Sequence, residues 1–245
     1  MKTLVPLALC ILQCLGAACA AQAATAPVAE EVLVTATRTD KTVIPGASLR
    51  RPADFALQRV KVSSDAPELP ARKDDILATL RLLQSAAARD RTVELCVLLD
   101  GRMVAPLRID ASSIKFSAGV RPQTSEVIVA VKSRVDPGTP PGPALFAKLK
   151  DFPAAIKPAG RAAIDVVGDV DLTLEDPAKY RSRVIELYAA DARAVTTSLG
   201  TEYRVVTRGI DKQLQWVRDG MSDVVIYIPY EYDVIPANVS SYSRP

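Results

Sequence analysis

The chain has 245 residues, of which 49% are hydrophobic and 24% are charged, and its formal net charge at pH 7 is +3. This composition is typical of a globular protein and excludes a disordered chain, while so small a net charge disfavours a nucleic-acid partner. The sequence contains no histidine. Catalysis by Ser-His or Cys-His pairs and metal sites with histidine ligands are therefore excluded, which leaves carboxylate, lysine and tyrosine chemistry.

The first 23 residues have the pattern of a cleavable export signal. Lys2 gives the positive start, residues 4–15 form an apolar run too short to span a bilayer, and small residues follow it. Cleavage fits after Ala20 or Ala23, and we favour Ala23. A lipid anchor on Cys19 is disfavoured because Leu15 lies four positions before it instead of three. The sequence therefore predicts a periplasmic protein without lipoprotein anchoring.

Residues 24–51 are rich in Ala, Thr, Val and Pro, and the pair Pro45-Gly46 interrupts any regular element. We expect a flexible N-terminal arm there, a folded domain over residues 52–236 and a tail over residues 237–245.

The first half of the folded domain contains one helical pattern among strand patterns. Residues 53–63 predict a strand whose apolar residues change face, which indicates a bulge. Residues 70–89 carry apolar residues at helical spacing. Strands are expected at 93–99 and 104–109, with Asp100-Gly101 in the turn between them. A strand at 125–135 has apolar residues on both faces, as if both were covered.

The second half begins after a proline-rich loop at residues 136–143, which also allows a division into two halves that each contain strand and helix. A short helix is expected at 144–156 and a strand at 162–174. Asp176 and Pro177 predict the N-cap and first turn of a long helix ending at Gly200. Strands follow at 203–207, 214–218 and 223–234. This order predicts an α+β fold, with helices packed on a largely antiparallel sheet.

Residues 52–236 resemble the SIMPL domain family of bacterial exported proteins. The resemblance rests on Ala53-Asp54-Phe55, on the helix segment Tyr188-Ala189-Ala190-Asp191-Ala192-Arg193-Ala194 before Leu199-Gly200, and on the strand Tyr227-Ile228-Pro229-Tyr230. It implies a periplasmic or outer-membrane-associated protein, in some members linked to oxidative-stress defence and in some oligomeric, with no established catalytic residues. A homo-oligomer is thus one expectation.

The segment from Glu30 to Arg38 is similar to the TonB box of TonB-dependent outer-membrane receptors. A complete receptor is rejected on length, because about 200 residues cannot supply a barrel of some 22 strands of about ten residues each. A mobile segment rich in β-branched residues can still add to the sheet edge of a partner. The residues expected to dock in this way are Val32, Leu33, Val34, Thr35 and Ala36.

Other candidate residues have simpler structural interpretations. Cys96 lies in an apolar run typical of a buried strand, and without histidine nothing nearby activates its thiol. The acidic stretch from Asp165 to Asp176 fits no EF-hand spacing. The tyrosines near the C-terminus, with Trp216, suit a platform for a sugar or nucleotide but are also favoured strand residues.

We therefore expect no catalytic, cofactor-binding or metal-binding residues and no enzyme activity. The leading hypothesis is an exported SIMPL-like module that acts through protein contacts in the envelope, with a link to stress defence implied only by the resemblance. Two alternatives stay open. One is a small-ligand binder or envelope enzyme that uses the acidic residues and tyrosines, and the other is an adaptor that docks to TonB-like partners through the N-terminal arm.

Overall fold

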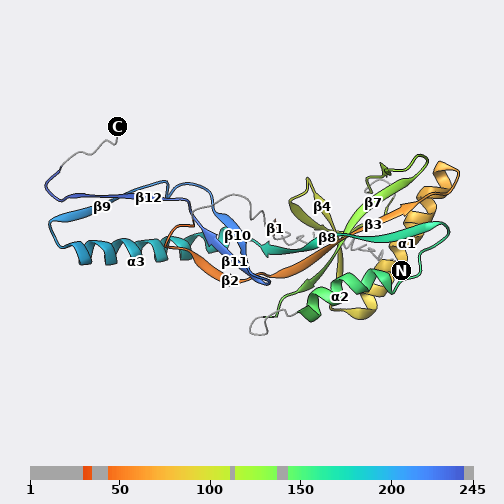
Figure 1. Cartoon of the computed structure of the whole chain (residues 1–245), viewed down its shortest axis with the longest axis horizontal. Coiled ribbons are helices and arrows are strands. Elements are labelled where there is room, and N and C mark those ends of the chain that lie inside the picture. The colour runs from red at the N-terminus through yellow and green to blue at the C-terminus, as the bar shows by residue number, and fades with distance from the viewer. Residues whose placement is uncertain (1–29, 35–43, 111–113, 137–142, 240–245) are drawn as a thin grey trace, which may run out of the picture.

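The structure is a computed structural model that describes residues 30–34, 44–110, 114–136 and 143–239. The predicted signal peptide and most of the N-terminal arm lie outside these residues. The molecule is elongated, with a strand barrel and two helices at one end and a thin unit of one helix and two strands at the other (Figure 1). A small sheet joins the two ends.

Six antiparallel strands close into the barrel. Their order around it is β3-β8-β1-β5-β4-β7, and β7 pairs back with β3. The short strand β6 (Ser117–Ala118) pairs with β7 outside this circuit. The six strands are β1 (Glu31–Val34), β3 (Phe55–Ser64), β4 (Glu94–Leu99), β5 (Met103–Pro106), β7 (Ser125–Arg134) and β8 (Ala162–Glu175).

The barrel strands carry apolar side chains on both faces because each face has a core of its own. Inside the barrel, a small cluster consists of Leu33, Leu57, Cys96, Val104 and Ala130. On the outer face, Val60 and Val62 of β3 belong to the main core, together with Ile76 and Leu80 of α1 (Leu69–Asp90). The helix α2 (Pro143–Ala154) adds Leu149 to the same core. The apolar change of face at residues 53–63 therefore reflects two covered faces of one regular strand.

A bulge does occur opposite this strand, in β8. The register between β3 and β8 shifts between Leu57 and Arg59. Gly168 of β8 has φ of +69°, a conformation that favours glycine. The buried Gln58 amide nitrogen donates to the carbonyl oxygens of Val167 at 2.9 Å and Gly168 at 3.3 Å. Gln58 thus satisfies carbonyl groups where the ladder is interrupted.

The rest of the chain forms the joining sheet and the thin end. The joining sheet has the order β10-β11-β2, from β2 (Leu49–Pro52), β10 (Gln215–Asp219) and β11 (Asp223–Tyr227). The turn η1 (Pro177–Tyr180) leads into α3 (Arg181–Leu199), which lies along the hairpin of β9 (Tyr203–Arg208) and β12 (Glu231–Pro236). We call α3, β9 and β12 together the extension.

The predicted mixed α+β class and the mostly antiparallel pairing are confirmed, with the correction that the main sheet closes into a barrel. The Asp100-Gly101 turn is confirmed, with φ of 50° and 70° at its two residues. The proline-rich loop, whose residues 137–142 lie outside the described chain, connects β7 to α2 at the barrel end.

Several expectations about individual elements need correction. Residues 31–34 and 49–51, placed by the sequence in a flexible arm, belong to β1 and β2, and β2 continues to Pro52. Asp176 has φ of 48° and makes no side-chain cap, because the chain enters α3 through η1. The last predicted strand divides into β11 and β12 around Pro229, which has no N–H to donate to a ladder.

Candidate functional site

The residues expected to dock to a TonB-like partner lie in the barrel wall. Val32, Leu33 and Val34 are buried in β1, which pairs with β8 along its whole length and contacts β5 on the other side. Thr35 and Ala36 lie outside the described residues. Both edges of β1 face neighbouring strands in this structure, so strand addition to a partner would require β1 to leave the barrel.

A buried ion pair holds β1 in place. The Lys132 ammonium donates to Glu31 Oε2 at 2.5 Å, and Thr173 Oγ1 donates to Glu31 Oε1 at 2.6 Å. Lys132 also lies 4.2 Å from the centroid of the Phe55 ring. Burial alone lowers the pKa of Lys132, but the hydrogen bond and charge of Glu31 outweigh it and raise the pKa. Lys132 therefore stays positively charged, and the contacts of Glu31 with Lys132 and Thr173 tie three barrel strands together.

Cys96 occupies the barrel interior. It is 1% exposed, and its thiol donates weakly to the carbonyl of Ala130 at 3.6 Å. Burial raises its pKa to about 12. A thiol in this state is neither a nucleophile nor a metal ligand near neutral pH, in agreement with the structural role predicted from the sequence.

The acidic stretch of β8 is used in ion pairs with β3. Asp165 pairs with Lys61 at 3.1 Å and Asp171 pairs with Arg59 at 2.8 Å. Within the described residues, no group of three or more Asp, Glu, Cys or His side chains is arranged to hold a metal ion. These two ion pairs therefore connect β8 to its neighbour β3.

Tyrosines gather where the extension meets the joining sheet. The rings of Tyr188 and Tyr230 meet edge to face with centroids 4.6 Å apart, and Tyr232 stacks on Tyr230 at 6.2 Å. The Tyr230 hydroxyl accepts from the Ala47 N–H at 3.1 Å and donates to Asp191 at 3.4 Å. Beside this cluster is an open groove of about 530 Å³, lined by both Tyr230 and Tyr232. Trp216 packs separately against the main core.

Burial raises the pKa of both Tyr188 and Tyr230, with a smaller contribution from the nearby Asp191 carboxylate. These hydroxyls are therefore protonated at neutral pH and can donate hydrogen bonds. They cannot serve as general bases there.

The extension buries very little of itself. Of the 19 residues of α3, only Val184 is buried, although apolar side chains recur along it at helical spacing, at Val184, Tyr188, Val195 and Leu199. In β9 and β12, only Ile235 is buried. By contrast, α1 buries five residues against the barrel. A helix whose apolar stripe stays half open normally covers it with another surface.

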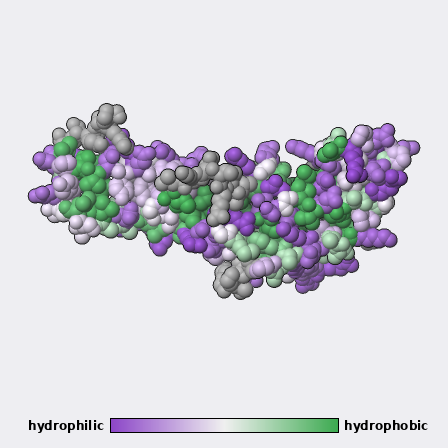
Figure 2. Space-filling view, viewed as in Figure 1, coloured by the Kyte–Doolittle hydropathy of each residue, from purple (hydrophilic) through white to green (hydrophobic). Residues whose placement is uncertain are grey.

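Large apolar side chains consequently reach the solvent along the extension. Figure 2 shows apolar surface over this end of the molecule, between polar margins. The large apolar side chains of the extension that are 37% to 46% exposed are Ile185, Leu199, Tyr203, Tyr232 and Val234. From the sequence, the tyrosines near the C-terminus were candidates, whereas the long helix was expected to pack on the sheet. The alternation of Tyr232 and Val234 with charged residues was the available signal.

Comparison with known proteins adds no relative: neither a protein-family model nor a curated protein matches the chain. Among the described residues, none of the helices has the length and apolar character needed to cross a membrane.

Proposed function

We propose that this chain is a non-enzymatic binding module exported to the bacterial periplasm, and that the extension is the surface through which it contacts another protein. The observation that carries the proposal is the burial of a single residue in the 19-residue helix α3. Export is supported by the signal-like pattern of residues 1–23.

The composition of the extension supports a protein contact. Aromatic side chains are enriched in interfaces because they bury a large area with few rotatable bonds. Tyr203 and Tyr232 are exposed on the extension, and the branched side chains of Ile185 and Val234 are exposed with them. The ion pair of Arg183 with Glu186 at 2.8 Å lies on the exposed surface of α3. An apolar strip with a charged margin is the usual anatomy of a non-obligate interface.

The free strand edges of the extension offer a second mode of contact. The sheet of β9 and β12 contains these two strands alone, so each has one edge without a strand partner in the described chain. Such edges accept a strand from another protein through main-chain hydrogen bonds, while neighbouring side chains select the sequence. The exposed apolar side chains of β12 would then contact the added strand or the layer behind it.

The test compares two substitutions of similar exposure. Val234→Glu places a carboxylate on the extension, and Leu82→Glu places one on α1, where Leu82 is 44% exposed. Each purified protein is immobilised and exposed to an envelope extract, and bound proteins are quantified by mass spectrometry. We expect saturable capture that Val234→Glu abolishes and Leu82→Glu leaves intact, with both variants keeping the parent melting temperature within a few degrees. Equal capture by all three proteins would overturn the proposal.

The same proteins are examined by light scattering, because a second copy of the chain is one partner that the extension would accept. A mass that falls from oligomer to monomer in Val234→Glu alone identifies self-association. An unchanged monomer mass in all three assigns the contact to a different protein.

A further inference from the structure

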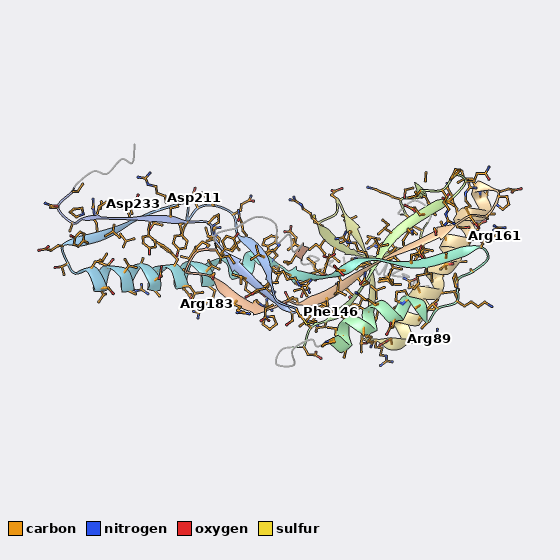
Figure 3. All side chains as sticks on the ribbon, in the orientation of Figure 1. Arg89, Phe146, Arg161, Arg183, Asp211 and Asp233 are labelled. Carbon is orange, nitrogen blue, oxygen red and sulfur yellow. The ribbon has the colours of Figure 1, made fainter. Side chains whose placement is uncertain are left out.

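A polar groove at the far end of the barrel is independent of the extension and of the function proposed for it. Three neighbouring strands, β7, β3 and β8, run on past the closed part of the barrel, because β4 pairs with β7 only at residues 130–132 and β1 pairs with β8 only at residues 172–175. The groove has a volume of about 370 Å³ and is bounded on one side by the β6–β7 turn. Arg161 marks this end of the molecule in Figure 3.

The side chains on the floor of the groove continue the inner face of the barrel. Along β3, Leu57 lies inside the barrel, and Lys61 and Ser63 follow on the same face. Lys61 is opposite Asp165 of β8, and Ser63 is opposite Glu126 of β7. The groove is therefore the mouth of the barrel, a place where barrels commonly bind small molecules.

The charged groups of the groove balance each other, with three cations and three anions among the lining residues. Four of them form two ion pairs, Lys61 with Asp165 at 3.1 Å and Arg161 with Asp65 at 2.8 Å. The hydrogen bond from Arg161 lowers the pKa of Asp65, which keeps that carboxyl group ionised.

The remaining two charged side chains are Arg121 and Glu126. Neither forms an ion pair or a side-chain hydrogen bond with another residue in the described part of the chain, and the same is true of the Ser63 hydroxyl. The groove thus offers one guanidinium, one carboxylate and one hydroxyl that form no ion pair or side-chain hydrogen bond among the described residues, while the charge of Arg121 also helps to lower the pKa of Asp65.

Hydrogen bonds of side chains and of the main chain fix the walls of the groove in position. Asp75 of α1 accepts from Ser64 Oγ at 3.0 Å and from the Arg161 N–H at 3.1 Å, and Thr79 Oγ1 accepts from the Ala159 N–H at 3.0 Å. On the opposite side, the Gly119 N–H donates to the Thr124 carbonyl at 3.0 Å. The groove is therefore shaped before any ligand arrives, which lowers the entropic cost of binding.

From this balance of charge we propose that the groove binds a small zwitterion, a free amino acid or short peptide, with its carboxylate on Arg121 and its ammonium on Glu126. A guanidinium binds a carboxylate through two parallel hydrogen bonds, and a carboxylate accepts well from an ammonium group. A polyanion would meet three carboxylates, and an apolar ligand would desolvate six charged groups, so neither fits.

The test uses glycine, glycylglycine and triglycine, whose two charges are progressively farther apart, with binding followed by calorimetry and by amide chemical shifts. We expect saturable binding of at least one of them, with shifts at residues 61–65, 120–126 and 161–165. The N-acetylated form and the C-terminal amide of that probe should each bind about tenfold more weakly, because each loses one charge-assisted hydrogen-bonded contact.

Two substitutions assign the contacts. In Arg121→Gln, the probe and its C-terminal amide should bind with equal affinity, because the partner of the probe carboxylate is gone. In Glu126→Gln, the probe and its N-acetylated form should bind with equal affinity, because the partner of the probe ammonium is gone. Arg183→Gln on the extension changes the net charge as Arg121→Gln does and should leave the affinity unchanged. The proposal is overturned if none of the three probes binds saturably, if blocking a charge has no effect, or if both groove variants bind like the parent. Because the probes and the two groove variants leave the extension unchanged, none of these outcomes bears on the function proposed above.

Discussion

The barrel and the extension contain similar elements but differ in what covers them. In the barrel, all four residues of β1 are buried, and β3 is covered on both faces, by the cluster inside and by α1 and α2 outside. The extension has one helix on one hairpin, and most of its apolar side chains keep contact with solvent. The comparison teaches that an apolar stripe in the sequence predicts a surface that packs against another one. The stripe does not indicate whether that other surface belongs to the same chain or to a partner.

The largest expected effect concerns the ion pair inside the barrel. Lys132→Met should lower the free energy of unfolding by about 4 kcal/mol, because it leaves the Glu31 carboxylate buried without its cation. Urea denaturation measures the loss. The double variant Glu31→Leu/Lys132→Met is the control and should recover most of the stability. If the single and double variants were equally unstable, the pair would not be the anchor of β1.

Replacing one leucine by alanine in each region compares the packing of the barrel and of the extension directly. Leu80→Ala, in the fully buried face of α1, should cost about 3 kcal/mol because it leaves a cavity in the main core. Leu199→Ala, at the exposed end of α3, should change the stability by about 0.5 kcal/mol or less. Chemical denaturation of both variants gives the two values. Comparable costs would mean that the extension is packed as tightly as the barrel.

A substitution at Gly160 tests the contact between the wall of the groove and Asp75 of α1. Gly160 has φ of +54°, and a Cβ at this position would lie 2.0 Å from Asp75 Oδ1. Gly160→Ala should therefore destabilise the barrel by about 2 kcal/mol, from the strained φ and the displaced Asp75 carboxylate. Gly46→Ala is the matched control, because a Cβ there meets nothing within 4 Å. Melting temperatures should fall for the first variant only.

The stability of the barrel should fall in alkaline solution. Below pH 9 the Cys96 thiol is neutral in both folded and unfolded chains, whereas between pH 9 and about 12 the unfolded thiol loses its proton and the buried one keeps it. The unfolded state then binds fewer protons, so unfolding becomes easier as the pH rises. In Cys96→Ala the fall with pH should be shallower than in the parent. Parallel curves for the two proteins would contradict the burial of the thiol.

The smallest effect is one of dynamics. Amide protons of α3 should exchange with solvent faster than those of α1, on the order of tenfold or more, because few buried contacts oppose local opening of the extension. Exchange monitored by mass spectrometry on peptides from the two helices measures this difference. Equal protection would remove the contrast between the regions.

Much of the element pattern could be predicted from the sequence, because β3, α1, β7 and β8 are long and strongly periodic. Closure of the barrel could not be predicted, because it depends on β1, a strand of only four residues. One of the two strands that pair with β1 is β8, which follows it in the sequence by more than a hundred residues. The run Val32-Leu33-Val34 has strand-forming side chains, but nothing local indicates which edges it will fill. Deleting residues 24–50 would consequently remove a barrel strand.

The candidate sites were harder to predict than the fold. Arg121 and Glu126 are ordinary charged residues in the sequence, and only the hairpin of β6 and β7 brings both to one groove. Likewise, the apolar stripe of α3 predicts a packed helix, and its exposure depends on how little sheet the chain supplies to cover it. Both features arise from the number and placement of strands, which periodicity does not encode.

The most direct test of the extension as a contact surface is photo-crosslinking at single positions in cells that carry the protein. A benzophenone amino acid is placed at Leu199 or Tyr232 on the extension, or at Leu82 or Leu99 on the barrel, positions that are 37% to 46% exposed. The account predicts discrete protein adducts, or a dimer of the chain, from Leu199 and Tyr232 and none from Leu82 and Leu99. Adducts from the barrel positions alone, or from none of the four, would contradict it.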